Sequence, residues 1–419
     1  MGWWRSVRWS IGASRRDNRA PVATDAALTA VFREETGRLT AALVRALGDF
    51  DLAEELVQEA LLEAVEHWPK DGIPDKPGAW LLTTARRKAV DQFRRQARFR
   101  EKVARLEGAS MRDDTAEGDD RLRLIFTCCH PALSREAQVA LTLRAVAGLT
   151  TIEIARAFIT SEATIAQRIV RAKRKIVDAK IPYRVPAERD MGERLEEVLA
   201  VLYLMFNEGY LATAGERASR RDLAEDAVWL AGLMVRLMPE EPEALGLLAL
   251  MRLHLARADS RFDQDGNLVL LQDQDRGRWD RERIASALVV LQRAAALRRS
   301  GPYQLQAAIA ACHAEASSWE ETDWRQIVAL YDVLLELMPS PVVQLNRAIA
   351  RHYIGGAASA LAEVDALQDL LDDYYLFHAT RAELLRDLGR DAESRAALAR
   401  ALELTANPAE RTLLQRRLG

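Results

Sequence analysis

The stretch LTTIEIARAFITSEATIAQRIVRAKRKI, Leu149 to Ile176, decides how the chain around it folds. Apolar residues recur in it at spacings of three and four, which is the period of an amphipathic helix. The pattern breaks at Thr160 and Ser161, and Ser is a preferred residue for capping the N-terminus of a helix. The stretch therefore predicts two short helices joined by a tight turn. The first helix is expected to bury Ile152, Ile154, Ala155 and Phe158.

The helix predicted from Glu162 onward has two different sides. Ile165, Ile169 and Ala172 form its apolar side, and the opposite side is polar and basic. Two short helices with a tight turn, the second one basic, are typical of a helix-turn-helix, which places its second helix in the major groove of DNA. A basic side is also common on solvated surface helices, but the short helix and the capped turn favour DNA binding. The basic side presents Gln167, Arg168, Arg171, Lys173, Arg174 and Lys175.

A second basic segment, PGAWLLTTARRKAVDQFRRQARFR, spans residues 77–100 and holds seven Arg or Lys against a single acid, Asp91. Its apolar side includes Trp80, Leu81 and Ala85. The segment follows DLAEELVQEALLEAVEHWP, residues 51–69, which reads as an acidic amphipathic helix. The acidic helix cannot match all of the basic excess, so we expect the segment 77–100 to face a polyanion.

The composition bounds the class of protein. The chain has 419 residues, of which 49% are hydrophobic and 29% charged, as in a folded globular protein of two or three domains. Residues 1–185 carry 32 Lys or Arg and 25 Asp or Glu, whereas residues 186–419 carry 27 and 37. This asymmetry predicts a front half that faces nucleic acid and a back half with another task. No run of 18 apolar residues occurs and there are three cysteines, so we expect a cytoplasmic protein without a membrane partner.

Breaks in the pattern predict an all-α protein with five segments. The polar stretch GASMRDDTAEGDD at 108–120 reads as part of a linker, and KIPYRVPAERD at 180–190 contains two prolines that mark a boundary. The N-terminus is basic and aromatic, without the apolar core of a signal peptide. The predicted segments are a basic tail at 1–24, a helical domain at 25–100, a linker at 101–120, a helix-turn-helix domain at 121–182 and a helical extension at 183–419.

The extension contains a repeat. Ala348 and Ala382 stand 34 residues apart, as do Gly355 and Gly389, and 34 is the period of tetratricopeptide helical hairpins. A turn-like LMP at residues 237–239 recurs at 337–339. The pattern predicts a tetratricopeptide-like stack of helical hairpins, and a non-repetitive helical bundle is the alternative.

Two other stretches contain residue types that are common in metal or redox sites. FDQDGNLVLLQDQD, residues 262–275, is rich in carboxylates but lacks the ligand spacing of a calcium loop, so a polar loop or a hairpin docked on the preceding domains is expected. IFTCCHPALS, residues 125–134, places Cys128 and Cys129 beside His130. Pro131 and a capping Ser134 indicate a helix end followed by a helix start, with redox or metal chemistry as a minor alternative. No P-loop, Gly-rich dinucleotide turn or HExxH motif occurs, so we expect no enzyme, catalytic residue, cofactor or metal.

The two basic blocks and the acidic helix together resemble an RNA polymerase sigma factor of the extracytoplasmic-function type. DLAEELVQEALLEA and AWLLTTARRKAVDQFRR resemble region two, and the helix-turn-helix resembles region four. The resemblance implies that the acidic helix binds core RNA polymerase, through Glu55, Leu56, Gln58 and Glu59. Region two would bind the melted −10 element, through Trp80, Arg86, Arg87, Lys88, Arg94 and Arg95. Region four would read the −35 element, through Thr164, Gln167, Arg168, Arg171, Lys173 and Arg174.

The extension is similar to that of a subgroup of these sigma factors with a tetratricopeptide-like C-terminal domain. FNEGYLAT at 206–213 and QDRGRWD at 274–280 carry this likeness. The resemblance implies a transcription initiation factor whose extension regulates it, by an intramolecular contact or by binding a protein partner. A polymerase-independent helix-turn-helix regulator with a tetratricopeptide sensor is the alternative, and a helical scaffold is a third. Relatives often have Asn where this chain has Arg87, so the promoter sequence is not predicted.

Overall fold

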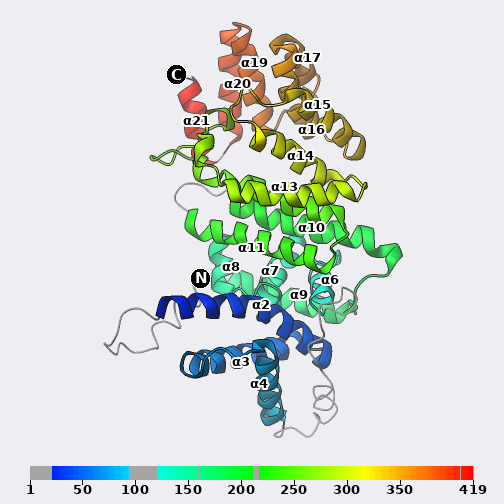
Figure 1. The fold of residues 1–419 in the computed structure, drawn as a ribbon. Helices are drawn as coiled ribbons and strands as arrows, with labels where there is room; N and C mark the ends of the chain where they lie inside the picture. The colour runs from blue at the N-terminus through cyan, green and yellow to red at the C-terminus, as the bar shows by residue number, and fades with distance from the viewer. Residues whose placement is uncertain (1–20, 94–119, 159, 211–216, 406, 419) are drawn as a thin grey trace. The chain divides into compact units, whose positions relative to one another are not determined.

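The computed structural model describes residues 21–418 except 94–119, 159, 211–216 and 406. The described residues form helices joined by turns, and they divide into two compact units, 1–208 and 209–419. The prediction of an all-α protein is therefore confirmed. Figure 1 follows the chain from the first to the last described helix. Most of the basic tail, most of the predicted linker, and Arg94 and Arg95 lie outside the described residues.

The first unit begins with a three-helix module. The module consists of α2 (Pro21–Leu47), α3 (Phe50–Asp71) and α4 (Pro77–Phe93). Asp49 caps α3, because its carboxylate accepts a hydrogen bond from the backbone N–H of Leu52 at 3.1 Å. The core of the module is closed by aromatic rings, with Trp68 packed 5.4 Å from Phe32 and 5.3 Å from Trp80 between ring centroids.

The second module of this unit contains the helix-turn-helix. Its helices are α6 (Asp120–Cys128), α7 (Arg135–Ala145), α8 (Thr151–Ala157) and α9 (Glu162–Asp178), and α10 (Glu188–Tyr210) follows them. The predicted cap at Ser161 is confirmed, since its hydroxyl accepts from the N–H of Thr164 at 3.1 Å. A capping box formed by Thr150 and Glu153 begins α8. The prediction for Ile152 is wrong, because its side chain points outward and is exposed.

The predicted junction at residues 125–134 is confirmed as the link between two helices. Helix α6 ends at Cys128, and Ser134 caps α7. Cys128 and Cys129 are fully buried, and burial raises the pKa of the Cys129 thiol to about 11. The side-chain amide of Gln138 donates to the carbonyls of Cys129 and His130 at 3.2 and 2.9 Å. The two thiols therefore stay protonated and pack as small apolar groups.

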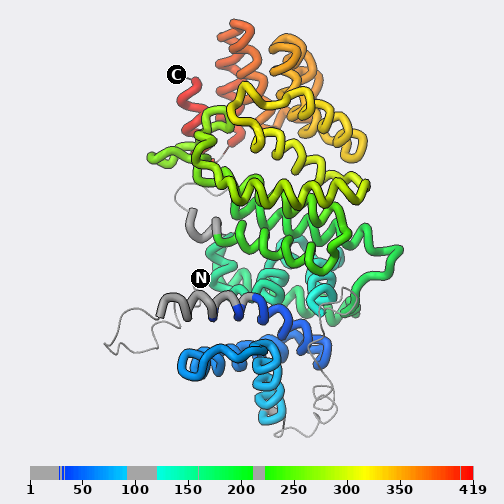
Figure 2. Tube along the Cα trace, viewed as in Figure 1, coloured from blue at the N-terminus to red at the C-terminus, as the bar shows by residue number. Residues whose placement is uncertain are grey.

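The second unit is a series of helices in which each packs against its neighbours along the chain. Figure 2 traces them in order by colour. This order of contacts is typical of stacked helical hairpins. The tetratricopeptide identity itself stays a prediction. The helices are α11 (Arg217–Leu237), α12 (Pro242–Ala256), α13 (Arg281–Ala296), α14 (Pro302–Glu315), α15 (Trp324–Leu337), α16 (Pro341–Gly355), α17 (Ala357–Asp365), α18 (Gln368–Leu371), α19 (Tyr375–Asp387), α20 (Asp391–Leu404) and α21 (Pro408–Leu418).

Only part of the predicted repeat coincides with the structure of the hairpins. Ala348 and Ala382 are both buried in one hydrophobic cluster, as small residues between packed helices should be. The glycines that turn the chain with positive φ are Gly356 and Gly389, at +83° and +72°. Gly355, which the repeat paired with Gly389, is instead the last residue of α16. The LMP turns do follow the ends of α11 and α15 as expected.

The carboxylate-rich insertion between α12 and α13 is a compact loop. It contains the short turns η3 (Ala258–Ser260), η4 (Leu271–Asp273) and η5 (Arg276–Arg278), with one bridge between Phe262 and Leu268. Trp279 anchors the loop in the core of its own unit, beside Leu253 and Ile284. Asp280 caps α13 by accepting from the N–H of Arg283 at 2.9 Å. Among the described helices, none has the length and apolar character to cross a membrane.

Candidate nucleic-acid and polymerase interface

The exposed stripe of α9 is the clearest candidate surface. Ile165, Ile169 and Ala172 are buried as predicted, with 1%, 5% and 2% exposure, so the orientation of the helix is settled by its packing. Spacings of three and four place residues on one side of a helix. Gln167, Arg171 and Arg174 share such a stripe, and all three are exposed. Thr164 begins the stripe, where its N–H is held by the Ser161 cap.

The long polar side chains of this stripe form few contacts with other described residues. Arg174 forms a surface ion pair with Asp178, at 3.4 Å, and both side chains are well exposed. Such a pair contributes little in water, so the guanidinium can be transferred to another anion at small cost. Arg168 is half-buried and lies near Glu136 at the start of α7, where its charge helps to lower the pKa of that carboxyl after the larger effects of hydrogen bonds from the backbone and from Ser134.

Lys173 does not belong to this surface, which corrects the sequence-based assignment. Its side chain is 10% exposed, and its Nζ lies 2.7 Å from Asp51 Oδ1 and 3.3 Å from Glu54 Oε2. Glu54 also accepts from Arg144 Nε at 3.2 Å. Lys173 is therefore held by carboxylates of α3, which lies in the first module. In this conformation it is not available to a DNA phosphate.

The described part of the second basic segment is partly neutralised within its own module. Arg87 and Lys88 of α4 both pair with Glu63 of α3, Lys88 at 3.2 Å. Arg87 remains largely exposed, at 60% of its side chain. Arg86 turns inward: its Nε and Nη2 are buried and have no hydrogen-bond partner among the described atoms. Arg87 and Lys88 are therefore the accessible cations of the described part of this segment.

Trp80 and Leu56 both serve packing in this structure. The Trp80 ring meets the edge of Trp68 and packs against the core of the first module. Leu56 is fully buried in the same core. The outer side of α3 carries Glu55 and Gln58, which are exposed, and Glu59, which is half-buried. Of the four residues expected to contact polymerase, Glu55, Gln58 and Glu59 are therefore accessible, and Leu56 lies in the core behind them.

The first and second modules are packed against each other, which the sequence did not reveal. Arg121, with 2% exposure, donates to Glu34 of α2 at 3.0 Å, and Arg45 pairs with Asp120 at 3.2 Å. The α2 backbone at Gly37 comes so close to α7 that a Cβ there would stand 2.7 Å from the carbonyl oxygen of Val146. These contacts join residues 75 or more positions apart, so they cannot be predicted from a local sequence pattern.

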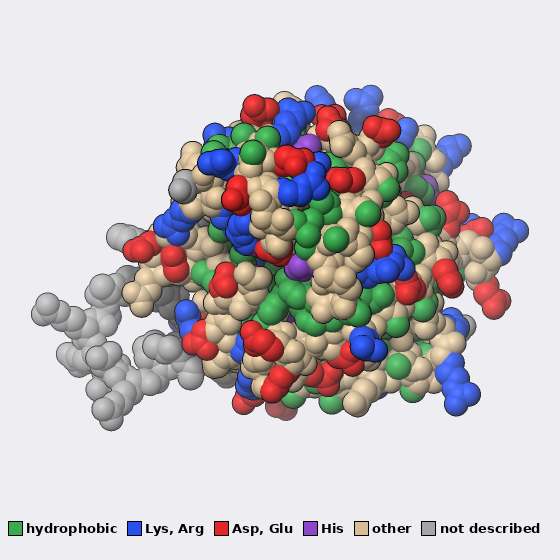
Figure 3. Space-filling view, turned by 90° about the horizontal axis from the view of Figure 1, so that it is seen from above, with side chains coloured by type: hydrophobic (Ala, Val, Ile, Leu, Met, Phe, Trp, Pro, Cys, Tyr) green, Lys and Arg blue, Asp and Glu red, His purple; other side chains and the backbone are tan. Residues whose placement is uncertain are grey.

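Charges of both signs are mixed on the face of the molecule shown in Figure 3. Acidic and basic side chains alternate there with apolar ones. Acidic side chains therefore do not gather into a single acidic surface on this face. Within the second unit, Arg347 contacts Asp332 at 2.5 Å and Glu363 at 3.3 Å.

Comparison with known proteins identifies three segments of the chain. The family models for Sigma-70 region 2 and Sigma-70 region 4 match residues 31–99 and 123–176. A family of unknown function, DUF6596, matches residues 194–295. The two sigma matches coincide with the modules that carry α2–α4 and α6–α9. The third match covers the helices from α10 to α13.

Similar proteins include two sigma factors and one longer relative. The chain is 44% identical to an uncharacterized protein of Rhizobium meliloti over 90% of this chain and 92% of that protein. It is 30% identical to the ECF RNA polymerase sigma factor SigL of Mycobacterium tuberculosis, over 38% of this chain and 93% of SigL. It is 32% identical to the ECF RNA polymerase sigma factor SigK of Mycobacterium bovis, over 36% of this chain and 85% of SigK. No solved structure is significantly similar to the chain.

Proposed function

Because the chain belongs to the extracytoplasmic-function RNA polymerase sigma factors, we propose that it brings core RNA polymerase to promoters whose −35 and −10 elements it reads with α9 and α4. Membership of the family implies binding of core RNA polymerase and promoter DNA. The family acts in transcription initiation without being enzymatic, so we assign no catalytic residue. The exposed stripe on α9 is the observation that carries the proposal for DNA. Run-off transcription with core polymerase is its direct test.

For the −35 element, the stripe supplies both kinds of contact that a recognition helix needs. Gln and Arg side chains can each make two hydrogen bonds to the major-groove edge of adenine and guanine, respectively. Gln167 and Arg171 lie in the N-terminal and central part of α9 and are our base-reading candidates. Thr164 at the start of α9, together with Arg168 and Arg174, is assigned to the DNA backbone, because hydroxyls and cations hold phosphates and fix the register.

For the −10 element, α4 offers Arg87 and Lys88 as exchangeable cations. Both are paired with Glu63. Burial raises the pKa of the Glu63 carboxyl, but the hydrogen bonds from Arg87 and Lys88 lower it by more, so the net shift of the pKa is downward. Phosphates of a melted strand would compete with Glu63 for the two cations. Single strands are held by such basic grooves together with aromatic rings on which bases stack. Trp80 would have to leave its packing on Trp68 to take part, so we assign it to the core.

The packing of the two sigma modules implies a closed state that must open. The −35 and −10 elements lie about 25 base pairs apart by their own numbering, or roughly 85 Å along B-DNA at about 3.4 Å per base pair. Lys173 of α9 touches Asp51 of α3 directly. Modules in direct contact cannot reach two elements so far apart. We therefore propose that binding of polymerase separates them and releases Lys173.

Replacing Gly37 with alanine should favour the open state. The new Cβ would stand 2.7 Å from the Val146 carbonyl oxygen, which belongs to a backbone that cannot turn aside. Overpacking of this kind costs about 1–3 kcal/mol, and here it destabilises the contact between the two modules. We expect a larger radius of gyration by small-angle X-ray scattering, and tighter binding to −35 duplex DNA. Gly192→Ala in α10 is the matched control, because its Cβ would meet nothing within 4 Å. An unchanged radius of gyration for Gly37→Ala would contradict the closed state.

We propose that the C-terminal unit regulates the factor or binds a protein partner. A chain ending at Glu208 keeps α10 as far as that residue. The part kept includes Arg194, which donates to the carbonyl of Phe126, and Glu197, which pairs with Arg135 at 2.7 Å. If the unit restrains the sigma modules, this truncation should raise −35 DNA binding severalfold in a mobility-shift assay. Loss of run-off transcription by a folded truncation would instead make the unit an activating part. Equal activity with and without it would remove the regulatory role.

A further inference from the structure

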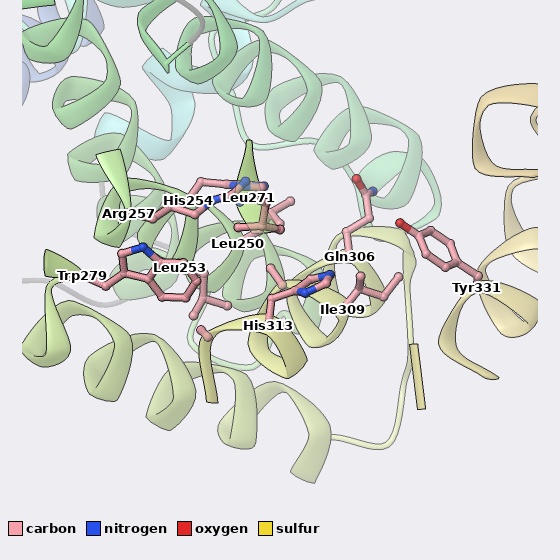
Figure 4. A pocket seen from close by; sticks show the side chains of 12 residues that line it. Leu250, Leu253, His254, Arg257, Leu271, Trp279, Gln306, Ile309, His313 and Tyr331 are labelled. Carbon is pink, nitrogen blue, oxygen red and sulfur yellow. The ribbon is translucent and has the colours of Figure 1, made fainter. Parts of the chain in front are cut away.

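The second unit contains a cavity of about 280 Å³ between α12, the insertion, α14 and α15 (Figure 4). Its size is close to the lower end of the range for sites that bind small organic molecules, which starts at about 300 Å³. Leu250, Leu253 and Ile309 make much of its wall apolar. The cavity belongs to one unit and draws on both the DUF6596 segment and the helices that follow it.

The wall carries a positive charge without a matching acid. Arg257 lines the cavity, and the lining residues include no Asp or Glu. Among the ion pairs of the described residues, none involves Arg257. Its Nη2 donates to Nδ1 of His254 at 3.3 Å, which leaves most of its guanidinium hydrogens for another acceptor. A half-buried arginine in an apolar wall is an arrangement that recognises an anion.

Nearby donors add to the positive potential of the cavity. Trp279 also lines it, is 4% exposed, and its indole Nε1 has no hydrogen-bond partner among the described atoms. Arg276 lies over the Trp279 ring, with 4.9 Å from Cζ to the ring centroid, and its Nη2 is buried without a partner too. Indole and guanidinium nitrogens only donate. Both groups are therefore buried donors, and an acceptor group bound in the cavity could supply a partner.

The two histidines of the wall are kept neutral. Burial, reinforced by Arg257 and Arg276, lowers the pKa of His313 to about 4. Burial also holds the pKa of His254 well below its usual range, with Arg257 and Arg261 acting in the same direction. A neutral His254 can accept the hydrogen bond from Arg257 and so orient the guanidinium. His254 is thus a positioning residue for Arg257.

The opposite side of the cavity offers a neutral polar pair. Figure 4 shows the phenol of Tyr331 and the amide of Gln306 across the cavity from Trp279. Burial raises the pKa of Tyr331 to about 12, so its hydroxyl is a neutral donor or acceptor at physiological pH. Gln306 donates its amide N–H to the Pro302 carbonyl at 3.2 Å, which orients its oxygen. This side suits a neutral polar substituent on the ligand.

We propose that the cavity binds a small organic carboxylate with an apolar or aromatic body, and that Arg257 holds the carboxylate. The planar fork of one guanidinium matches the two oxygens of one carboxylate. The apolar wall covers the body, as in most small-molecule sites. A regulatory effect of this ligand rests on the sigma-factor function proposed above. Binding itself does not, and it is measured without polymerase, so the two proposals can fail separately.

The test uses the full chain and titration calorimetry with phenylacetate and indole-3-acetate, each compared with its neutral amide. We expect the carboxylates to bind at least about tenfold more tightly than the amides. A tenfold difference in Kd corresponds to about 1.4 kcal/mol of binding free energy. Arg257→Gln should lose this preference. Arg293→Gln removes the same charge from an exposed position on α13 and should retain it. Ala310→Leu, which fills the cavity and leaves Arg257 in place, should weaken binding of both ligand types.

Three results would overturn the proposal. The first is no binding of either carboxylate up to about 10 mM, which is weaker than a specific small-ligand site requires. The second is equal affinity for acids and amides, which would make the cavity merely apolar. The third is unchanged carboxylate binding by both Arg257→Gln and Ala310→Leu, which would place the ligand elsewhere. The melting temperature of each variant without ligand checks that it is folded.

Discussion

Replacing Gln58 and Glu59 together with alanine is expected to abolish stable binding to core RNA polymerase. Both residues stand on the outer side of α3, where they contribute nothing to the core that Leu56 and Trp68 form. Hot-spot residues near the centre of a protein interface cost about 2 kcal/mol or more when truncated, and we expect both to be of this kind. Loss of the pair should therefore weaken the complex by roughly a hundredfold or more. Size-exclusion co-elution with core polymerase, and run-off transcription, measure the effect.

The matched control for this variant is Glu66→Ala, which removes an exposed acid from a later turn of the same helix. It should bind polymerase as the unchanged chain does. If the double variant also co-elutes normally, α3 is not the polymerase-binding element. The alternative of a polymerase-independent regulator would then become the better explanation, because such a regulator needs only the helix-turn-helix to act.

Arg171→Ala is expected to reduce binding to promoter DNA with the second largest effect. Arg171 is exposed at the middle of the α9 stripe, and the buried Ile169 and Ala172 beside it keep the helix in place. Loss of one two-pronged contact to a base costs about 1–3 kcal/mol, or roughly 5- to 150-fold in affinity. The variant should also relax the preference for one base at one position of the −35 element. Competition binding with singly substituted duplexes measures both changes.

Arg184→Ala provides a control of equal charge, since Arg184 is exposed beyond the end of α9. It should weaken binding uniformly and slightly, through the salt-dependent attraction to phosphates alone. A uniform loss for Arg171→Ala, with the base preference intact, would move that residue from base reading to phosphate contact. The folded state of both variants can be checked by their melting temperatures.

The helix-turn-helix could be predicted well because its determinants are local. The Ser161 cap and the buried Ile165, Ile169 and Ala172 follow from spacing within a single stretch of chain. The burial of Ile152 could not be predicted in this way. An apolar residue in a helix of seven residues can lie on either side, and Ile152 is exposed. Leu56 lies within a polymerase-binding motif by resemblance, and burial assigns it to the core instead.

The sequence by itself determined the all-α class, the order of the sigma modules and the caps that begin α8 and α9, because these depend on residues a few positions apart. Only the tertiary structure decided that Lys173 is held by Asp51 and Glu54, and that Arg257 stands without an acid in an apolar cavity. Asp51 and Lys173 are 122 positions apart. A charge pattern shows how many cations a helix carries, but which of them meets an anion of its own chain depends on packing between distant segments.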